Sequence, residues 1–248
     1  MRIIAIIALH LIPLAFALSG QWIIAIMFTV LLHFTILFGT LIPPFPLFGK
    51  LIKRTPDLPP GVATPDSVLL TFDDGPHPEF TPQILELLDE YETRAVFFVI
   101  GEKAAQHPDI IRDIAARGHL IGNHTQTHPS HRFWRIFARE AAAEIDECQR
   151  TIETLTGTRP IMFRPPVGMH NPFVFDALQR RALPCIMWSH RGFDTTSRDI
   201  ATIVKRLTDT TAPGAILMIH DHLPRSVEIT RRTLETLRSR GLTLAAKS

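Results

Sequence analysis

Two neighbouring carboxylates follow a short apolar run near the start of the hydrophilic part of this 248-residue chain. Asp73 and Asp74 come directly after residues 67–72 and before Gly75-Pro76. Side chains alternate along a strand, but where a strand gives way to a Gly-Pro turn two successive carboxylates can both reach one cavity. One of them can then bind a metal ion while its neighbour stays free as a base.

Two histidines complete a candidate metal site. His124 and His128 are four residues apart, which on a helical turn puts both imidazoles on one face. With Asp74 they form a three-ligand set that leaves positions open for water and substrate, as catalytic metal sites do. Alone, each motif is more typical of a turn or of solvated side chains. Together they predict a divalent metal; zinc is the default, and cobalt, manganese or iron also suit the set.

Further motifs follow in a fixed order along the chain. They are Gly101 after an apolar run, the segment 118–123 leading into His124, Arg164-Pro165-Pro166-Val167-Gly168, Trp188-Ser189, and the segment 217–221 around His220. From about residue 67 to 220 the chain resembles the polysaccharide deacetylases with a NodB-homology domain, carbohydrate esterase family four. The resemblance implies a distorted (β/α) barrel that removes an N-acetyl group from an N-acetylhexosamine of a glycan or a lipid-linked sugar. An O-acetyl polysaccharide esterase and a non-catalytic sugar-binding domain are the alternatives.

Hydrolysis of an amide or ester needs an activated water, a polarised carbonyl and a proton for the leaving group. A metal held by Asp74, His124 and His128 can supply the first two, and Asp73 is then the candidate general base. The resemblance implies the same roles for these four residues.

Other catalytic candidates lie in the later motifs. Arg164 can orient Asp73 through a two-pronged contact, although an Arg beside a strand end is as often a surface ion pair. His220 is the candidate general acid, and Asp194 is expected to orient it and raise its basicity. A structural position for His220 is the alternative.

Substrate contacts are expected from Val167, Trp188 and Leu217. The family usually has an aromatic residue where Val167 stands, and its backbone N–H helps to bind the developing oxyanion. Trp188 and Leu217 are expected to line the pocket for the acyl methyl group, a use compatible with ordinary core packing. The fourth motif departs most from the family: Arg191 replaces its first acid, which puts the substrate in doubt more than the reaction.

Short apolar runs alternate with amphipathic stretches from residue 67 onward, which predicts parallel strands joined by crossover helices. The catalytic candidates fall at or just past strand ends, where parallel barrels collect their catalytic groups. We expect strands at 67–72, 94–99, 119–123, 161–163, 184–189, 215–219 and 242–245. We expect helices near 81–91, 103–117, 136–156, 172–182, 199–211 and 226–239.

The first 49 residues have a different composition. Two apolar runs, 3–18 and 22–42, are separated by Ser19-Gly20-Gln21, which predicts a hairpin of two transmembrane helices. A basic, Pro-rich linker is expected at 50–65, and the catalytic domain at 66–248. Because every motif lies beyond residue 67, the first 54 residues are expected to anchor the enzyme without building its site.

Charge bears on location and partners. Arg2 precedes the first run and Lys50, Lys53 and Arg54 follow the second, so a two-helix hairpin in a bacterial inner membrane would leave the catalytic domain in the cytoplasm. If only one run crosses, the domain is periplasmic or extracellular. Membrane lipid and an acetylated carbohydrate or lipid-linked sugar are the expected partners. The net charge of +2, with scattered basic residues, does not indicate a nucleic-acid partner.

Overall fold

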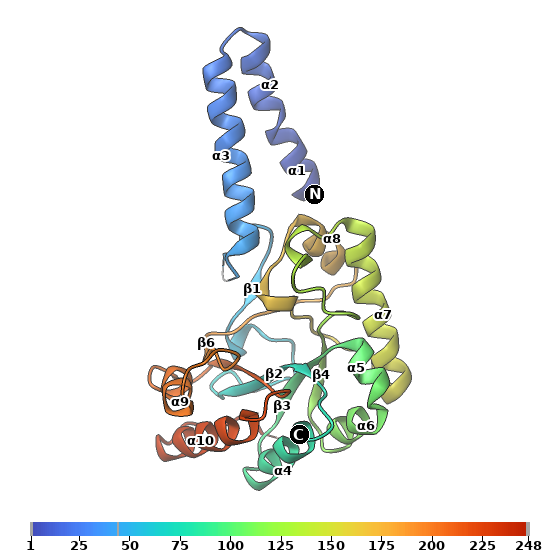
Figure 1. Cartoon of the computed structure of the whole chain (residues 1–248), viewed down its shortest axis with the longest axis vertical. Coiled ribbons are helices and arrows are strands. Elements are labelled where there is room, and N and C mark those ends of the chain that lie inside the picture. Colours follow the sequence, from blue (N-terminus) through green and yellow to red (C-terminus); the bar gives the residue numbers. More distant parts are fainter. Residues whose placement is uncertain (1, 44, 247–248) are drawn as a thin grey trace.

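The computed structural model describes residues 2–43 and 45–246. The N-terminal part forms a helical hairpin that projects from the rest of the molecule (Figure 1). Its first arm consists of α1 (Arg2–Leu9) and α2 (Leu11–Leu18), and its second arm is α3 (Trp22–Leu41). The arms run antiparallel, so the start of α1 and the end of α3 both lie beside the remainder of the chain (Figure 1).

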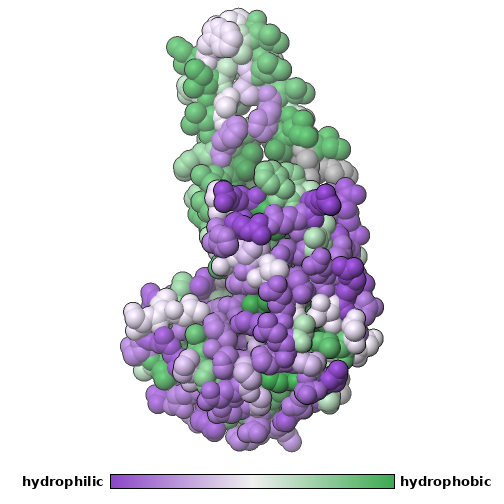
Figure 2. Space-filling model, turned by 45° about the vertical axis from the view of Figure 1, so that its right-hand side comes forward, coloured by the Kyte–Doolittle hydropathy of each residue, from purple (hydrophilic) through white to green (hydrophobic). Residues whose placement is uncertain are grey.

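The surface of this hairpin is mostly apolar, with a few hydrophilic residues, whereas the rest of the visible face is mainly hydrophilic (Figure 2). Among the described residues, only Phe137, Ile161 and Val167 are exposed large apolar side chains beyond residue 47. The 20-residue helix α3 is long and apolar enough to cross a membrane. The first arm provides only a shorter apolar helix, Ile6–Leu18, so a second membrane span stays a prediction.

A parallel sheet of five strands forms one wall of the remaining domain, in the order β4-β3-β2-β7-β6. These strands are β2 (Leu69–Gly75), β3 (Ala95–Val99), β4 (Leu120–Asn123), β6 (His190–Arg191) and β7 (Ile216–His220). Each pairing is parallel, as the alternation of apolar runs and amphipathic stretches predicts.

Short backbone pairings close this sheet into a ring. β1 (Leu51–Ile52) pairs in parallel with β5 (Cys185–Ile186). Phe163 forms bridges to Asn123 of β4 and to Cys185. Beyond β1, Arg54 forms an antiparallel bridge to Ala215, directly before β7. The expected distorted (β/α) barrel is therefore confirmed, and its irregular side is built from strands of only two residues and single bridges.

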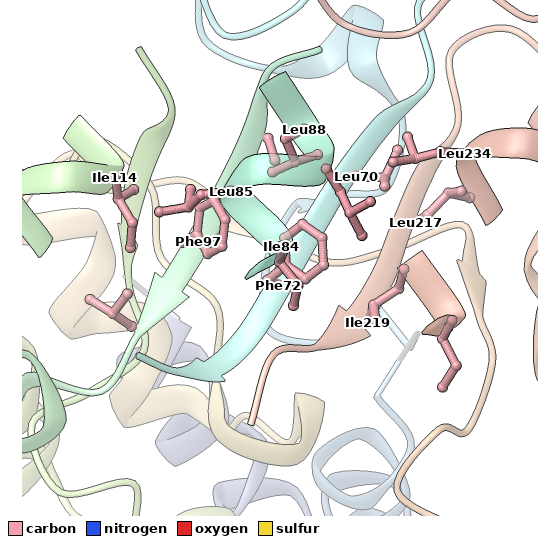
Figure 3. Packing of buried hydrophobic residues seen from close by; sticks show 14 of the residues in the cluster. Leu70, Phe72, Ile84, Leu85, Leu88, Phe97, Ile114, Leu217, Ile219 and Leu234 are labelled. Carbon is pink, nitrogen blue, oxygen red and sulfur yellow. The ribbon is translucent and has the colours of Figure 1, made fainter. Parts of the chain in front are cut away.

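Alternating side chains of the strands face the barrel interior and the surrounding helices. Leu69, Val96 and Ile216 belong to an interior cluster, whereas the neighbours Leu70, Phe97 and Leu217 pack outward against the helices. Figure 3 shows this outer layer, in which Leu217 lies near Leu234 of α10 and Phe72 near Ile84 of α4. Burial of two hydrophobic faces fixes the register of the strands, because a slip of one residue would exchange the faces.

Helices surround the barrel at most of the expected positions: α4 (Phe80–Glu90), α5 (Gly101–Gln106), α6 (Pro108–Ala116), α7 (Ala138–Thr156), α8 (Pro172–Arg180), α9 (Ile200–Thr208) and α10 (Ser226–Ser239). The helix expected at 103–117 is two helices, because His107 leaves helical geometry before Pro108 begins α6. The strand expected at 242–245 forms only isolated bridges, Val68–Leu244 and Thr93–Ala246.

The segment 50–65 differs from the expected linker, because it packs on the domain. Ile52 is 5% exposed, and its carbonyl accepts a hydrogen bond from the Met187 N–H at 2.7 Å. Thr55 is buried and donates through Oγ1 to the Pro65 carbonyl at 2.7 Å. The apolar residues before the prolines thus supply a barrel strand, which the high Pro content concealed.

Candidate metal centre and catalytic site

A β-bulge brings the two neighbouring carboxylates to one cavity. The pairing of β2 with β3 shifts register between Asp73 and Gly75, and Asp74 has a φ of 70°. A bulged residue interrupts the alternation of side chains along a strand. Asp73 and Asp74 consequently both line the same cavity at the C-terminal end of β2. The expectation that both carboxylates reach one cavity is fulfilled by this bulge.

Asp74 meets both histidines of the predicted ligand set. Its Oδ1 lies 3.2 Å from Nε2 of His124 and 3.0 Å from Nε2 of His128. Nδ1 of His124 lies 2.7 Å from the Arg164 carbonyl oxygen, which can only accept, so Nδ1 carries the proton and Nε2 presents a lone pair. Burial alone would raise the pKa of Asp74, but the two imidazoles outweigh it and hold the pKa well below its usual range.

These three residues fit a divalent cation. Their ligand atoms all lie within 4.8 Å of one another. Asp74 Oδ1 and His128 Nε2 are buried and have no hydrogen-bond partner among the described residues. A carboxylate oxygen and imidazole lone pairs that converge in this way need a positive charge between them, and a two-His, one-carboxylate set suits zinc and several other divalent metals. The chain's own polar atoms therefore support the predicted metal site.

Backbone strain is concentrated around the cavity. Five non-glycine residues there have positive φ angles: Asp74 (70°), Thr125 (70°), His128 (52°), Val167 (50°) and Phe193 (58°). Such conformations cost about 1–3 kcal/mol each and persist only where the surroundings hold them. Hydrogen bonds hold two of them: the Thr125 N–H donates to Asn123 Oδ1, and the His128 N–H donates to Thr125 Oγ1.

Arg164 orients Asp73 from inside the barrel. Its Nη1 donates to Asp73 Oδ1 at 2.6 Å and to Thr71 Oγ1 at 2.7 Å. The guanidinium also donates to the carbonyls of Ile186 and Met187, and its Cζ lies 4.1 Å from the centroid of the Phe98 ring. Arg164 is completely buried, so the surface ion pair considered above is excluded. The contact to Asp73 uses a single carboxylate oxygen.

His220 stands at the end of β7 with Asp194 behind it. Nδ1 of His220 lies 2.9 Å from Asp194 Oδ1, and the His220 N–H donates to Oδ2 at 2.7 Å. Burial would lower the pKa of His220, but the hydrogen bond and charge of Asp194 outweigh it and raise the pKa to about 9. The other ring nitrogen, Nε2, faces the cavity and lies 3.9 Å from Asp74 Oδ2. Because the pKa is raised, the imidazole is protonated at neutral pH.

The loop after Arg164 forms another wall of the cavity. Val167 and Gly168 both line it. In the described part of the chain the Val167 N–H has no hydrogen-bond acceptor, whereas the next two N–H groups donate to Pro165 and Pro166. A Cβ added to Gly168 would lie 2.6 Å from the Trp188 ring and 2.8 Å from Pro43 Cβ. Pro43, just past the end of α3, therefore lies directly against this loop.

Most of the predicted site residues line this one cavity of about 140 Å³. Arg164 and Asp194 are buried behind its wall, where they contact Asp73 and His220, and Leu217 does not line it either. Leu217 is fully buried in the outer helix-facing cluster, so its expected role in the acyl pocket is wrong. Alternation along β7 places Met218 and His220 on the inner face instead. The spacing of two residues from His220 is a signal that identifies Met218. Arg191 and Thr195 also line the cavity, and sequence reasoning did not place them there.

A parallel α/β barrel with a two-His, one-carboxylate cluster and a second carboxylate at its C-terminal rim is the kind of site that hydrolases use. Comparison with known proteins is more specific. Residues 61–185 match the family model for polysaccharide deacetylase. The chain belongs to the polysaccharide deacetylase family.

Individual relatives agree with this assignment. The chain is 33% identical over 180 residues to the peptidoglycan-N-acetylglucosamine deacetylase of Bacillus cereus, covering 70% of this chain and 64% of that protein. It is 33% identical to the chitooligosaccharide deacetylase of Azorhizobium caulinodans over 159 residues, 64% of this chain and 75% of that one. The structure of peptidoglycan deacetylase PdaC from Bacillus subtilis superposes with a TM-score of 0.67 and 31% identity, covering 73% of this chain and 87% of that chain.

Proposed function

We propose that this protein is a metal-dependent hydrolase that removes the N-acetyl group from an N-acetylhexosamine of a glycan or a lipid-linked sugar. The observation that carries the proposal is the convergence of Asp74, His124 and His128 on one point, next to Asp73 and His220 in the same cavity. Sugar binding alone does not require three candidate metal ligands, the second carboxylate of Asp73 and the imidazole of His220 with its Asp194 partner in one site. The relatives named above are deacetylases of acetylated sugars.

Asp74, His124 and His128 hold the cation, which when bound supplies Lewis acidity to the acetamido carbonyl. Asp73 accepts the proton of the attacking water, and the buried Arg164 keeps its carboxylate turned toward the cavity. The free N–H of Val167 donates to the oxygen on which negative charge develops. Trp188 and Met218, both in the cavity wall, provide an apolar surface for the acetyl methyl group.

His220 donates the proton that lets the sugar amine leave. An amine is a poor leaving group without protonation, so an acid that stays charged at neutral pH is needed beside it. The Asp194 carboxylate provides that property by stabilising the imidazolium. Asp73 and His220 thus act at opposite stages, the first taking a proton and the second giving one.

A release assay tests the proposal. The full-length protein in detergent is stripped with chelator, reloaded with zinc, cobalt, manganese or iron, and given N-acetylated and O-acetylated oligosaccharides. We expect acetate and free amine from the N-acetylated substrates only when a divalent ion is present. Acetate from O-acetylated substrates alone would identify an esterase. Full activity of metal-free protein, or sugar binding without any hydrolysis, would contradict the proposal.

Membrane attachment through α3 is the second part of the proposal. The start of α1 and the end of α3 both lie beside the catalytic domain (Figure 1), and Lys50, Lys53 and Arg54 follow α3 closely, which supports a common side for both ends of the hairpin. By the positive-inside rule this side is the cytoplasm if both arms cross the inner membrane. Protease treatment of spheroplasts distinguishes the sides: a cytoplasmic domain is protected until the membrane is opened, whereas a periplasmic one is cleaved at once.

A further inference from the structure

Arg191 occupies a position at the catalytic cavity that the mechanism above does not use. It lies on β6 and shares the cavity wall with Asp73, Thr195 and His220. The nearby Arg164 guanidinium is already satisfied, because it donates to Asp73, Thr71 and two carbonyl groups.

Aromatic rings hold the Arg191 guanidinium in place. Its Cζ lies 4.1 Å from the centroid of the Phe193 ring and 5.3 Å from that of Trp188. The side chain is partly buried, and burial lowers its pKa from the usual value, yet a guanidinium remains charged throughout the physiological range. Stacking on ring faces fixes the plane of the group but satisfies none of its N–H donors.

Arg191 forms no ion pair within the described residues, although the charges of Asp194 and Asp73 act to raise its pKa. It takes part in no hydrogen bond or ion pair there, and its buried Nε is unsatisfied. Both carboxylates already have another partner: Asp194 contacts His220, and Asp73 accepts a hydrogen bond from Arg164. An unpaired charge that is held by aromatic rings and lines a reaction cavity is costly unless a ligand uses it.

We propose that Arg191 binds an anionic substituent of the substrate, a carboxylate or a phosphate, carried next to the acetamido group. The inference rests on the proposed deacetylase function and narrows its substrate class. Arg191 lines the same small cavity as Asp74, His128 and His220, so a group that reaches Arg191 must be close to the acetamido group. In a 2-acetamido sugar the neighbouring carbons are C1 and C3. A phosphate at C1 or a carboxylate-bearing ether at C3 meets this condition.

Matched substrates test the inference on the full-length, metal-loaded protein in detergent. One pair is a 2-acetamido sugar with a 3-O-lactyl group and its lactyl methyl ester. The other pair is the sugar 1-phosphate and the uncharged methyl glycoside. A charge-assisted hydrogen bond corresponds to roughly 10- to 100-fold in affinity, so we expect a kcat/KM ratio of that size within at least one pair. The pair that shows it identifies the anion as carboxylate or phosphate.

Variants assign the preference to Arg191. Arg191→Gln is expected to bring the ratio close to one, and Arg191→Lys to retain part of it, because a lysine keeps the charge without the planar fork. Arg206→Gln is the matched control: the Arg206 guanidinium also lies over the Phe193 ring, with Cζ at 4.8 Å, but does not line the cavity. This control should keep the wild-type ratio.

Three results would overturn the inference: no preference for charge in the wild type, the same preference in Arg191→Gln, or an equal loss on charged and uncharged substrates in that variant. Calorimetric binding of the charged and uncharged sugars makes the test independent of turnover. If no substrate is hydrolysed but the charged sugar binds more weakly to Arg191→Gln, the proposed function fails and the anion site stands. If hydrolysis occurs without a charge preference, the proposed function stands and the anion site fails.

Discussion

Asp194 uses both of its carboxylate oxygens on His220. Oδ1 lies 2.9 Å from the imidazole Nδ1, and Oδ2 accepts the His220 main-chain N–H at 2.7 Å. Because Asp194 is completely buried, water does not compete for these contacts. The ring is thereby fixed with Nδ1 protonated and Nε2 toward the cavity. Asp194 is thus a positioning residue whose effect on catalysis passes through His220.

Leaving-group dependence tests this relationship. His220→Ala is expected to reduce the rate on an N-acetyl sugar by roughly 10²–10⁴-fold, and to have much less effect on an aryl acetate, which leaves without protonation. Asp194→Asn removes the charge that stabilises the imidazolium, so the pKa of His220 falls and the alkaline limb of the rate profile moves to lower pH. Equal losses on both substrates, with an unmoved alkaline limb, would make His220 a structural residue.

Asp73 and Asp74 are adjacent, but substitution of each is expected to have a different effect. Asp74→Asn is expected to weaken metal binding, because it removes the only carboxylate of the ligand set. Asp73→Asn should retain the metal and lose roughly 10²–10⁴-fold in rate, the usual contribution of a general base. Metal content by mass spectrometry, with chelator competition, separates the two. Equal loss of metal from both variants would contradict the division of roles.

Asp73→Asn also carries a stability effect. It leaves the buried Arg164 guanidinium without its counter-charge, and loss of one partner of a buried ion pair typically costs about 3–5 kcal/mol. We therefore expect a lower melting temperature for Asp73→Asn than for Asp74→Asn in metal-free protein. The metal measurement on Asp73→Asn has to be made well below that temperature.

Sequence patterns predicted the regular side of the barrel and most of the residues that line the cavity. Apolar runs of five or six residues before Asp73, Gly101 and His220 form β2, β3 and β7. Strands of a parallel sheet are buried on both faces, so a short continuous apolar run is typical of them. The cluster of Asp74, His124 and His128 and the contact of Arg164 with Asp73 were predictable since they depend on residue type and motif order, although that contact uses one carboxylate oxygen and not two.

Features that depend on backbone geometry were not predictable. The bulge at Asp74 has no composition signal, and β1 consists of only two residues ahead of a Pro-rich stretch. The error at Leu217 is of another kind, because the alternation of side chains from His220 indicates Met218 once the inward face of His220 is known. The position of Arg191 at the cavity required β6, a two-residue strand too short for a periodicity.

Truncation separates the membrane hairpin from the barrel. Deleting residues 1–54 removes β1 together with Phe48 and Ile52, which are 2% and 5% exposed. Loss of two large buried side chains costs about 5–10 kcal/mol, comparable to the entire stability of a domain, about 5–15 kcal/mol. We expect this shorter protein to be unfolded, whereas deletion of residues 1–46 keeps both side chains and should fold.

Circular dichroism and melting curves of the two truncated proteins check this expectation. A folded, active protein that lacks residues 1–54 would show that β1 is dispensable and that the first 54 residues act only as an anchor. The protein that lacks residues 1–46 has also lost Pro43, which lies against Gly168. It should therefore bind metal normally but turn over more slowly than the full chain, because the Val167–Gly168 loop is less firmly held.

His170 makes the stability of this junction depend on pH. The imidazole is completely buried, and its Nε2 lies 3.3 Å from the Pro43 carbonyl oxygen. The Phe48 and Phe175 rings pack edge-on against it. Burial in these apolar surroundings lowers its pKa from 6.5 to about 4. In the unfolded chain the same group takes up a proton near pH 6.5.

The sign of the effect follows from proton linkage. Between pH 6.5 and about 4 the unfolded state binds the extra proton and the folded state does not, so the free energy of unfolding falls as the pH is lowered through this window. The stabilisation is complete above pH 6.5. At about 1.4 kcal/mol per unit of pKa, its loss reaches at most about 3 kcal/mol.

Denaturant unfolding of the full chain in detergent, followed by tryptophan fluorescence from pH 7 to pH 4, measures this loss. His170→Gln keeps an N–H donor for the Pro43 carbonyl but does not titrate, so its unfolding free energy should fall less steeply over this range. The exposed His131 provides the control, since His131→Gln is expected to follow the wild-type curve. Parallel curves for wild type and His170→Gln would show that His170 takes up its proton in the folded protein without strain. The junction between α3 and the catalytic loop would then be insensitive to acid.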